Sequence, residues 1–284
     1  MKIVILNQKG GVGKSSITVN LAYGLAVTGR KTLLIDLDPQ AHSSVIFCPE
    51  APRDATVREI FLDRRYSIKK VIRPACIHDN MVENLFIIPA NIHLATTAEQ
   101  INARAHREKL LHNHLEQIAD NFDFICIDCP PALNVLTVNA IYTSDLVLIP
   151  TTYGRYSLDG IADLFASISE VKESEKYEYR ILRNNFDPRT KVSNDYIEAQ
   201  LQPLADHVLH TVIRKTESIN QAQMNGEPVW TFDPRSRAVE DFASLIREFI
   251  SPADKEIMES CLEKRSPARA NFPVQMPLPV QRKS

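Results

Sequence analysis

The chain has 284 residues, 44% of them hydrophobic, and a formal net charge of −2. This length supports one full-sized hydrophobic core, and the near-neutral charge excludes recognition of nucleic acid by the overall field of the protein, so such contacts would need a local basic patch. The sequence has no apolar run near the ~18 residues of a membrane span and opens with no secretory signal, so we expect a cytoplasmic protein with no membrane association.

The first predicted element is a buried strand at residues 3–6, which leads into a glycine-rich loop and a helical segment at residues 15–27. Three of the eight glycines stand at positions 10, 11 and 13, where backbone N–H groups can turn inward and the helix N-terminus adds its positive dipole end. A strand, this loop and a helix together form the context of a phosphate-binding loop. In such a loop Lys14 reaches the β- and γ-phosphates and the Ser15 hydroxyl binds Mg²⁺.

The loop departs from the common pattern G-x-x-x-x-G-K-[ST], because Gln8 replaces the first glycine and Lys9 precedes the others. It resembles the loop K-G-G-x-G-K-[ST] of the ParA/Soj family of deviant Walker A ATPases. The resemblance implies that Lys9 crosses a dimer interface to the phosphates bound by the other subunit; the alternative is a solvated lysine at a strand end. It also implies an ATP-binding loop made of Lys9, Gly10, Gly11, Val12, Gly13, Lys14, Ser15 and Ser16.

A second buried strand is predicted at residues 31–35, and it ends in the string D-x-D-P-Q at residues 36–40. Acids at the carboxyl end of a parallel strand face the crevice in which ligands bind. The string again resembles the ParA/Soj family, which implies that Asp38 serves Mg²⁺ and the attacking water while Asp36 supports the loop. Residues 41–84 are assigned no chemistry, although residues 56–59 have the form of a capping box before a short helix.

The pattern then predicts a short strand at residues 85–89 and a long helix at residues 95–119. This helix carries His106, His112 and His114, whose spacing does not bring them to one helix face, so we expect solvated side chains and no metal site.

A third buried strand is predicted at residues 122–129, and its acid Asp128 has the place of a Walker B aspartate that holds the Mg²⁺ shell. The continuation D-x-P-P resembles the second switch of the ParA/Soj family. Cys126 and Cys129 form a C-x-x-C, but without a second pair at zinc-ligand spacing they are expected to be structural. No glutamate base stands beside Asp128, so any hydrolysis should be slow.

Strands that alternate with helices along the whole chain predict an α/β fold, with a doubly wound, mostly parallel sheet flanked by helices. The domain is expected at residues 1–250, followed by a C-terminal extension at 251–284 that ends in a Pro-rich basic tail, which we expect to be disordered. Further helices are expected at residues 136–140, 156–171 and 236–250, and further strands at 145–150 and 179–182. The segments 208–213, 218–224 and 229–232 complete the layout without an assigned type.

The resemblance also implies an adenine site and a DNA-binding surface. Asn184, with Pro234 beside it, would hold the adenine, although an asparagine at a strand end is otherwise a turn former. At position 218 the family often has a further basic residue, whereas this chain has Ser218. The alternative to a DNA-binding role is that the basic residues are ordinary solvated charges. The expected DNA-binding positions are Lys191, Arg214, Lys215, Arg237 and Arg247.

The function implied by the resemblance is plasmid or chromosome partition by a P-loop ATPase with ATP and Mg²⁺ as cofactors. An ATP-driven homodimer would bind non-specific DNA on the nucleoid and be released by slow hydrolysis that a ParB-like centromere-binding protein stimulates. The alternative is a ParA-like ATPase that positions a protein cargo. Membrane recruitment as in MinD is not expected, because the proline-rich tail cannot form an amphipathic helix. A metabolic or iron–sulfur ATPase is the third interpretation, disfavoured by the absence of cluster-ligand cysteine spacing.

Overall fold

The computed structural model describes residues 1–52, 54–154 and 160–263. Within these ranges one sheet runs in the order β3-β4-β2-β5-β1-β6-β7-β8, and all neighbouring strands are parallel except β3 and β4. This confirms the predicted α/β fold. The strands are β1 (Lys2–Ile5), β2 (Thr32–Asp36), β3 (Arg73–Ile77), β4 (Asn80–Ile88), β5 (Phe124–Asp128), β6 (Leu146–Thr152), β7 (Tyr179–Phe186) and β8 (Val208–Arg214).

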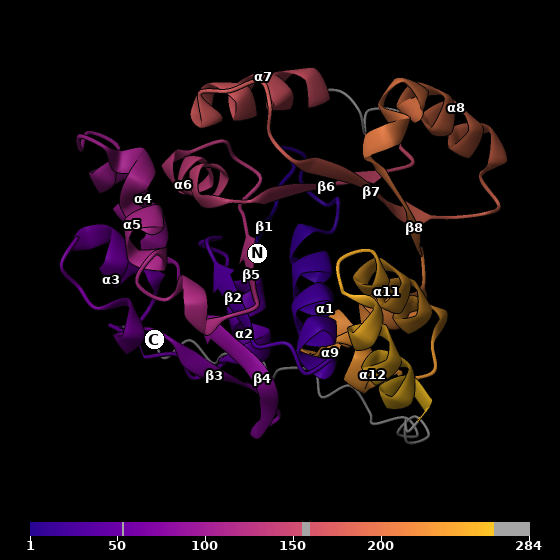
Figure 1. Cartoon of the computed structure of the whole chain (residues 1–284), viewed down its shortest axis with the longest axis horizontal. Helices are drawn as coiled ribbons and strands as arrows, with labels where there is room; N and C mark the ends of the chain where they lie inside the picture. Colours follow the sequence, from indigo (N-terminus) through magenta and orange to yellow (C-terminus); the bar gives the residue numbers. More distant parts are fainter. Residues whose placement is uncertain (53, 155–159, 264–284) are drawn as a thin grey trace, which may run out of the picture.

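Helices cover both faces of the sheet (Figure 1). The inner strands β2 and β5 are buried along their whole length, which explains their continuous apolar sequence. Side chains of α3 to α8 pack on one face, and those of α1, α2 and α9 to α12 on the other. The helices are α1 (Lys14–Val27), α2 (His42–Phe47), α3 (Val57–Leu62), α4 (His93–Ile101), α5 (Leu110–Leu115), α6 (Val135–Thr143), α7 (Ile161–Lys172), α8 (Lys191–Leu201), α9 (Glu217–Asn225), α10 (Val229–Phe232), α11 (Arg237–Arg247) and α12 (Pro252–Glu263).

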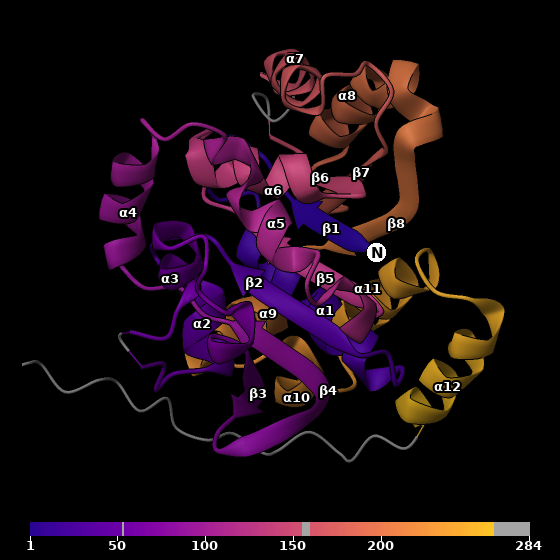
Figure 2. The ribbon, with the colours of Figure 1, turned by 60° about the vertical axis from the view of Figure 1, so that its left-hand side comes forward.

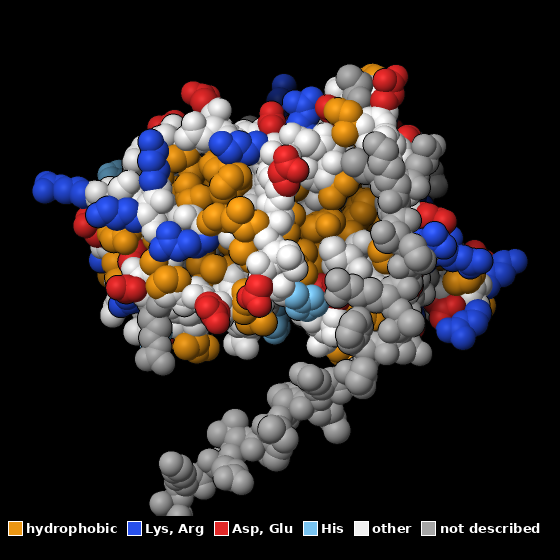
Figure 3. All heavy atoms as spheres, turned by 90° about the horizontal axis from the view of Figure 1, so that it is seen from below, with side chains coloured by type: hydrophobic (Ala, Val, Ile, Leu, Met, Phe, Trp, Pro, Cys, Tyr) orange, Lys and Arg blue, Asp and Glu red, His pale blue; other side chains and the backbone are white. Residues whose placement is uncertain are grey.

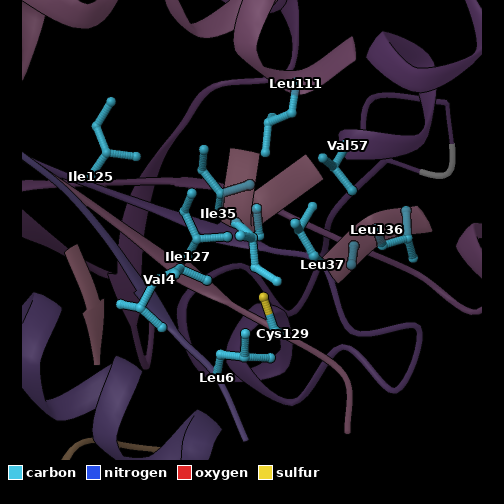
Figure 4. Packing of buried hydrophobic residues seen from close by; sticks show 14 of the residues in the cluster. Val4, Leu6, Ile35, Leu37, Val57, Leu111, Ile125, Ile127, Cys129 and Leu136 are labelled. Carbon is cyan, nitrogen blue, oxygen red and sulfur yellow. The ribbon is translucent and has the colours of Figure 1, made fainter. Parts of the chain in front are cut away.

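Figure 4 shows the core on the α3 to α8 face, where the Cys129 side chain lies among aliphatic residues of β1, β2 and β5. Cys126 is also buried but belongs to the core on the opposite face of the sheet. The two thiols of the C-x-x-C motif are therefore separated by the sheet, and both are free. No group of three or more His, Cys, Asp or Glu side chains within the described ranges is placed to hold a metal ion.

The edge hairpin formed by β3 and β4 was not predicted, since only residues 85–89 carry a clear strand pattern. Its turn residues His78 and Asp79 both have positive φ, 46° and 66°, as a tight two-residue hairpin requires. Glycine or asparagine usually takes these positions, and their absence hid the turn from the sequence. The capping box at Thr56 and Glu59 is confirmed, because both of its reciprocal hydrogen bonds are present.

The prediction of one long helix at residues 95–119 is wrong, because the segment divides into α4, a 3₁₀ turn (η2, Arg107–Lys109) and α5. Tertiary contacts hold the break. The Arg104 guanidinium donates to the carbonyls of Phe61 and Leu62, each at 2.9 Å. The Asn139 amide accepts from the Leu111 N–H at 2.9 Å and donates to the carbonyl of Arg107 at 2.7 Å. The Asn139 contacts satisfy the Leu111 N–H and the Arg107 carbonyl, which a continuous helix would have paired with each other.

The folded part continues past residue 250 into α12, which lies beside α11 (Figure 2). The Arg30 Nη2 donates to both carboxylate oxygens of the buried Asp254, each at 2.7 Å, and Met258 is fully buried. The Arg247 guanidinium also pairs with Glu259 at 2.6 Å. The expected basic tail at 264–284 lies outside the described residues, as does the start of the helix expected at 156–171. Among the described helices none has the length and apolar content that a bilayer span requires.

His114 was expected to be solvated, but its side chain is buried on α5, because this face of the short helix packs on the core. The buried imidazole predicts a loss of stability in acid. Burial lowers the pKa of His114, opposed in part by the Ile60 backbone carbonyl and by Asp63. The folded state therefore resists a proton that the unfolded chain accepts near pH 6.5. As pH falls below that value, the free energy of unfolding should decrease by up to about 1.4 kcal/mol per pH unit from this group.

Urea unfolding of the wild type and of the His114→Gln variant between pH 7.5 and about 5 measures this contribution. We expect a smaller pH dependence in His114→Gln, and an unchanged one in the exposed control His93→Gln. An identical pH dependence in His114→Gln and wild type would contradict the assignment.

Candidate functional site

The loop after β1 and the acids after β2 and β5 meet at one edge of the sheet, because these three strands are neighbours and parallel. Asp36 and Asp128 are direct partners in the register of β2 and β5, and Asp128 also pairs in register with Ile5 at the end of β1. The backbone of β1, β2 and β5 therefore gathers these acids beside the glycine loop.

Glycine conformations and one lysine shape the loop between β1 and α1. Gly11 and Gly13 have φ values of 75° and 90°, in the left-handed region that favours glycine. Lys14 is buried, with 7% of the residue exposed, and its Nζ donates to the carbonyl of Lys9 at 3.0 Å. The Asn7 Oδ1 accepts from the Lys9 N–H at 2.9 Å. The loop thus turns back on itself around the ammonium group of Lys14.

The Oδ1 of Asp128 is buried and has no hydrogen-bond partner among the described residues. The Asp128 Oδ2 accepts from the Ser43 hydroxyl at 2.6 Å. Burial raises the pKa of Asp128, the neighbouring Ser43 and Ser15 hydroxyls lower it, the charge of Asp38 raises it and that of Lys14 lowers it. The carboxyl therefore stands in a site that disfavours an uncompensated negative charge.

Asp36 has hydrogen-bond partners for both oxygens, all from the loop and helix that follow β2. Its Oδ2 accepts from the backbone and hydroxyl of Ser44 at 2.9 and 2.7 Å, and its Oδ1 from the Asp38 N–H at 3.0 Å. Burial and the charge of Asp128 raise the pKa of Asp36. These are the contacts of a residue that supports the loop rather than one that faces a ligand.

Lys14 is a buried positive charge, whereas Asp36 and Asp128 are buried acids. Burial lowers the pKa of Lys14, while the negative charges of Asp128, Cys129 and Asp38 raise it. A phosphate group would supply a counter-charge to Lys14, and a divalent cation would supply one to the carboxylates. The oxygen donors of Ser15, Asp38 and Asp128 are of the type that Mg²⁺ prefers, and Mg²⁺ usually takes only one or two protein oxygens together with phosphates and water. The residues present fit both groups.

Two serines to which the sequence analysis gave no role belong to this edge. Ser43 binds Asp128 and Ser44 binds Asp36, and both side chains are buried. The Ser44 hydroxyl also accepts from the Ala90 N–H at 2.8 Å. The available signal was position, because both serines follow within eight residues of Asp36 and share the buried face of α2 with Phe47.

The start of this helix is strained. Ala41 precedes α2 with φ 56°, a left-handed conformation that costs a non-glycine residue about 1–2 kcal/mol. Its N–H donates to the Asp38 carbonyl at 2.8 Å, and its carbonyl accepts from the Val45 N–H at 2.9 Å. The tight turn between Asp38 and α2 is therefore held by the contacts on both sides of it.

The residues expected at the adenine lie on the other side of the loop. Asn184, on β7, directs its Nδ2 to the Val12 carbonyl at 2.8 Å, so it contacts the phosphate loop directly. Pro234 is half-buried in the turn between α10 and α11. Ser218 donates its hydroxyl to Asp233 at 2.7 Å in the same region.

The five basic positions expected to contact DNA fall into two groups. Arg214 donates to Asp241 at 2.6 Å and lies 3.3 Å from Glu240, and Arg247 pairs with Glu259. Lys191, Lys215 and Arg237 are exposed, and none of the three forms an ion pair within the part of the chain that the structure describes. The structure therefore neutralises two of the five charges internally.

The sequence of this chain is similar to a known domain family and to known proteins. A family model described as an AAA domain matches residues 1–181. The sporulation initiation inhibitor protein Soj of Bacillus subtilis is 36% identical over 250 residues, which cover 87% of this chain and 96% of that protein. The chromosome partitioning protein ParA of Myxococcus xanthus is 31% identical over 252 residues, which cover 87% of each chain.

Two solved structures resemble the whole fold. A plasmid partition protein from Borrelia burgdorferi B31, described as putative and bound to AMPPNP, has 25% identity and a TM-score of 0.74 over 87% of this chain and 97% of its own. Cobyrinic acid a,c-diamide synthase from Mycobacterium smegmatis, with a bound ATP analogue and magnesium, has 26% identity and a TM-score of 0.71 over 88% of this chain and 95% of its own.

The packing of the loop against β7 predicts that Gly13→Ala disrupts the site. A Cβ at this position would lie 2.4 Å from Asn184 Nδ2, and the φ of 90° is itself unfavourable for alanine. We expect a loss of about 1–2 kcal/mol in the free energy of unfolding, measured by urea denaturation, together with a lower affinity for a fluorescent ATP analogue.

Gly10→Ala is the matched control for stability, because a Cβ at Gly10 meets no atom within 4 Å and its φ is not positive. Equal stability of the Gly13→Ala and Gly10→Ala variants would contradict the described packing.

Proposed function

This chain belongs to the ParA/Soj family of P-loop partition ATPases, and on that premise we propose that it is an ATP-gated DNA partition protein. In this proposal ATP and Mg²⁺ bind at the sheet edge, two copies associate face to face, and the dimer binds DNA without sequence preference. Slow hydrolysis, stimulated by a ParB-like partner, then releases the dimer. The observation that carries the proposal is the loop itself, in which a second lysine, Lys9, precedes a glycine cradle closed around Lys14.

Each residue of the site has a proposed role. Lys14 and the loop N–H groups from Gly10 to Ser16 hold the phosphates. Ser15, Asp128 and, through its place after β2, Asp38 hold Mg²⁺, whose chemistry is to neutralise charge on the phosphate oxygens. Asn184 is the proposed adenine contact, with Pro234 nearby. The hydrogen bond from Asn184 to the Val12 carbonyl supports a position of Asn184 beside the nucleotide.

The residue that follows Asp128 suits slow ATP hydrolysis, which would set the lifetime of the ATP-bound state, better than fast turnover. The residue after Asp128 is Cys129, a buried thiol whose pKa burial and the charge of Asp128 raise well above its ordinary value, so it is no general base at neutral pH. Asp38 is the remaining acid placed to orient an attacking water. Lys9 is half-exposed, and its side chain is available to reach the nucleotide of a second copy. We therefore assign catalysis to Lys9, Lys14 and Asp38.

The proposed setting is the cytoplasm, on nucleoid DNA. Of the expected basic positions, Lys191, Lys215 and Arg237 support DNA contact because they are exposed. The second candidate function is the positioning of a protein cargo, and the observation that favours it is the internal pairing of Arg214 and Arg247. The relation to a diamide synthase rests on the fold and the nucleotide, whereas Soj and ParA match with higher sequence identity, 36% and 31% against 26%.

Binding of the purified chain to an arbitrary DNA duplex, with ATP and with ADP, distinguishes the two functions. We expect binding only with ATP, weakened by about 10³-fold or more between roughly 50 and 200 mM salt if six or more phosphates are contacted. Fluorescence anisotropy of the labelled duplex measures it.

Lys14→Ala is the control, because it removes the ammonium group of the phosphate cradle and should abolish both ATP binding and ATP-dependent DNA binding. If the wild type binds ATP but no DNA in either nucleotide state, the partition function is wrong and the protein-cargo function is favoured.

Asp38→Ala should trap an ATP-bound dimer. Loss of the residue that orients water is expected to slow phosphate release by about 100-fold or more. The dimer, followed by light scattering after gel filtration, should then persist with ATP.

The exposed acid Asp163 on α7 provides a control of equal charge change, Asp163→Ala, which should turn over ATP at the wild-type rate. Normal turnover in Asp38→Ala would remove Asp38 from the mechanism.

A further inference from the structure

Positive charge is concentrated in two short segments of the N-terminal half. Residues 56–73 and 104–109 contain nine Lys and Arg residues against three acids, a net charge of +6, whereas the whole chain carries −2. The rest of the chain therefore carries −8. Figure 3 shows Lys and Arg side chains gathered at the end of the molecule that carries α3 and β3.

The two segments are joined in the fold. The Arg64 guanidinium donates to the Ala105 carbonyl, and Arg104 donates back to the carbonyls of Phe61 and Leu62. The first segment comprises α3 and the 3₁₀ turn η1 (Ile68–Lys70), and the second leads into η2. We call the exposed or half-exposed cations of this region the α3–η2 basic surface: Arg64, Arg65, Lys69, Lys70, Arg107 and Lys109.

None of these six cations forms an ion pair with an acid among the described residues. Of the Lys and Arg residues in the two segments, only Arg58 forms an ion pair within the described part of the chain. The three acids of the segments have other partners. Glu59 accepts from Thr56 and Arg58, Asp63 from the Arg65 N–H, and Glu108 lies 3.8 Å from His106 Nδ1. The like charges of the surface therefore repel one another without internal compensation, which favours an external polyanion.

The surroundings favour a nucleic acid backbone over a membrane. Binding to an anionic bilayer usually combines cations with large apolar side chains that enter the lipid interface. The large apolar residues that are exposed in the described ranges, such as Val45, Met81 and Ile92, all lie outside both segments. Lys and Arg side chains in segments that carry no exposed large apolar residue match the phosphates of duplex DNA.

We propose that the α3–η2 basic surface binds the phosphate backbone of duplex DNA. The proposal rests on the DNA-binding function proposed above but places the contact in the N-terminal half of the chain. It accounts for the internal neutralisation of Arg214 and Arg247, because the cations that follow α3 and those on η1 and η2 bind phosphates in place of these two arginines. The contacts are to phosphates and carry no sequence preference.

The test compares charge reversals in the full-length protein with ATP present. Lys69→Glu/Lys70→Glu alters two exposed cations of the surface. Lys176→Glu/Lys255→Glu makes the same charge change elsewhere, and Lys191→Glu/Lys215→Glu alters the C-terminal positions. Anisotropy of a labelled duplex is measured between roughly 50 and 200 mM salt, with binding of a fluorescent ATP analogue as the check that each variant is folded.

The expected result is an affinity at least tenfold lower for Lys69→Glu/Lys70→Glu than for the charge-matched control, with unchanged ATP binding. A milder variant, Lys69→Ala/Lys70→Ala, should reduce the slope of log affinity against log salt by about 2, since each phosphate contact contributes about 0.9. Both results would support the proposal even if the C-terminal variant also binds more weakly.

Three outcomes overturn it. Wild-type affinity in Lys69→Glu/Lys70→Glu alongside weaker binding in Lys191→Glu/Lys215→Glu refutes the surface but leaves the proposed function intact. Binding to vesicles of anionic phospholipid, or to single-stranded RNA, in preference to the duplex refutes duplex DNA as the partner. Absence of DNA binding by the wild type with ATP bound refutes both the surface and the DNA-binding function.

Discussion

The burial of two carboxyl groups side by side is the constraint on which the site depends. Asp36 and Asp128 are fully buried direct partners on β2 and β5, and their pKa values are raised by that burial. Such a pair persists only where hydrogen bonds and opposite charge compensate it. The compensation comes from Lys14 at the start of α1 and from Ser43 and Ser44 on α2. The glycine loop, the strand ends and α2 are therefore parts of one electrostatic arrangement.

Much of this arrangement could be predicted from the sequence because it is encoded locally. Apolar strands that end in acids, a glycine loop between strand and helix, and the capping box at Thr56 each depend on neighbouring residues. The fold class was accordingly predicted correctly. Ser43 and Ser44 were missed because a serine pair becomes informative only when the partner carboxylates, one of them 85 positions away, are known to adjoin it.

The errors have the same physical origin. The predicted helix at residues 95–119 is wrong because Asn139 binds the Leu111 N–H and the Arg107 carbonyl near the break. The periodicity of a sequence does not reveal such a competing partner. Likewise, Arg214 and Arg247 are basic in the sequence but paired in the fold. A count of charges gives the total field, whereas the field that a ligand meets depends on which charges are already paired. Long-range pairing is the information that a sequence pattern lacks.

The strained turn at Ala41 gives the site a mechanical property. Ala41 adopts a left-handed conformation between Asp38 and α2, and Ser43 and Ser44 fasten the helix to the two buried acids. The hydrogen bonds to Asp36 and Asp128 thus hold the turn at Ala41 in a strained conformation. Ser44 also accepts a hydrogen bond from the Ala90 N–H. If α2 moved away from the two acids, the connection between β4 and α4 would lose this contact as well. The strain at Ala41 is therefore balanced by the hydrogen bonds at the two carboxylates, so a change at either acid would act on α2 and on the segment before α4 together.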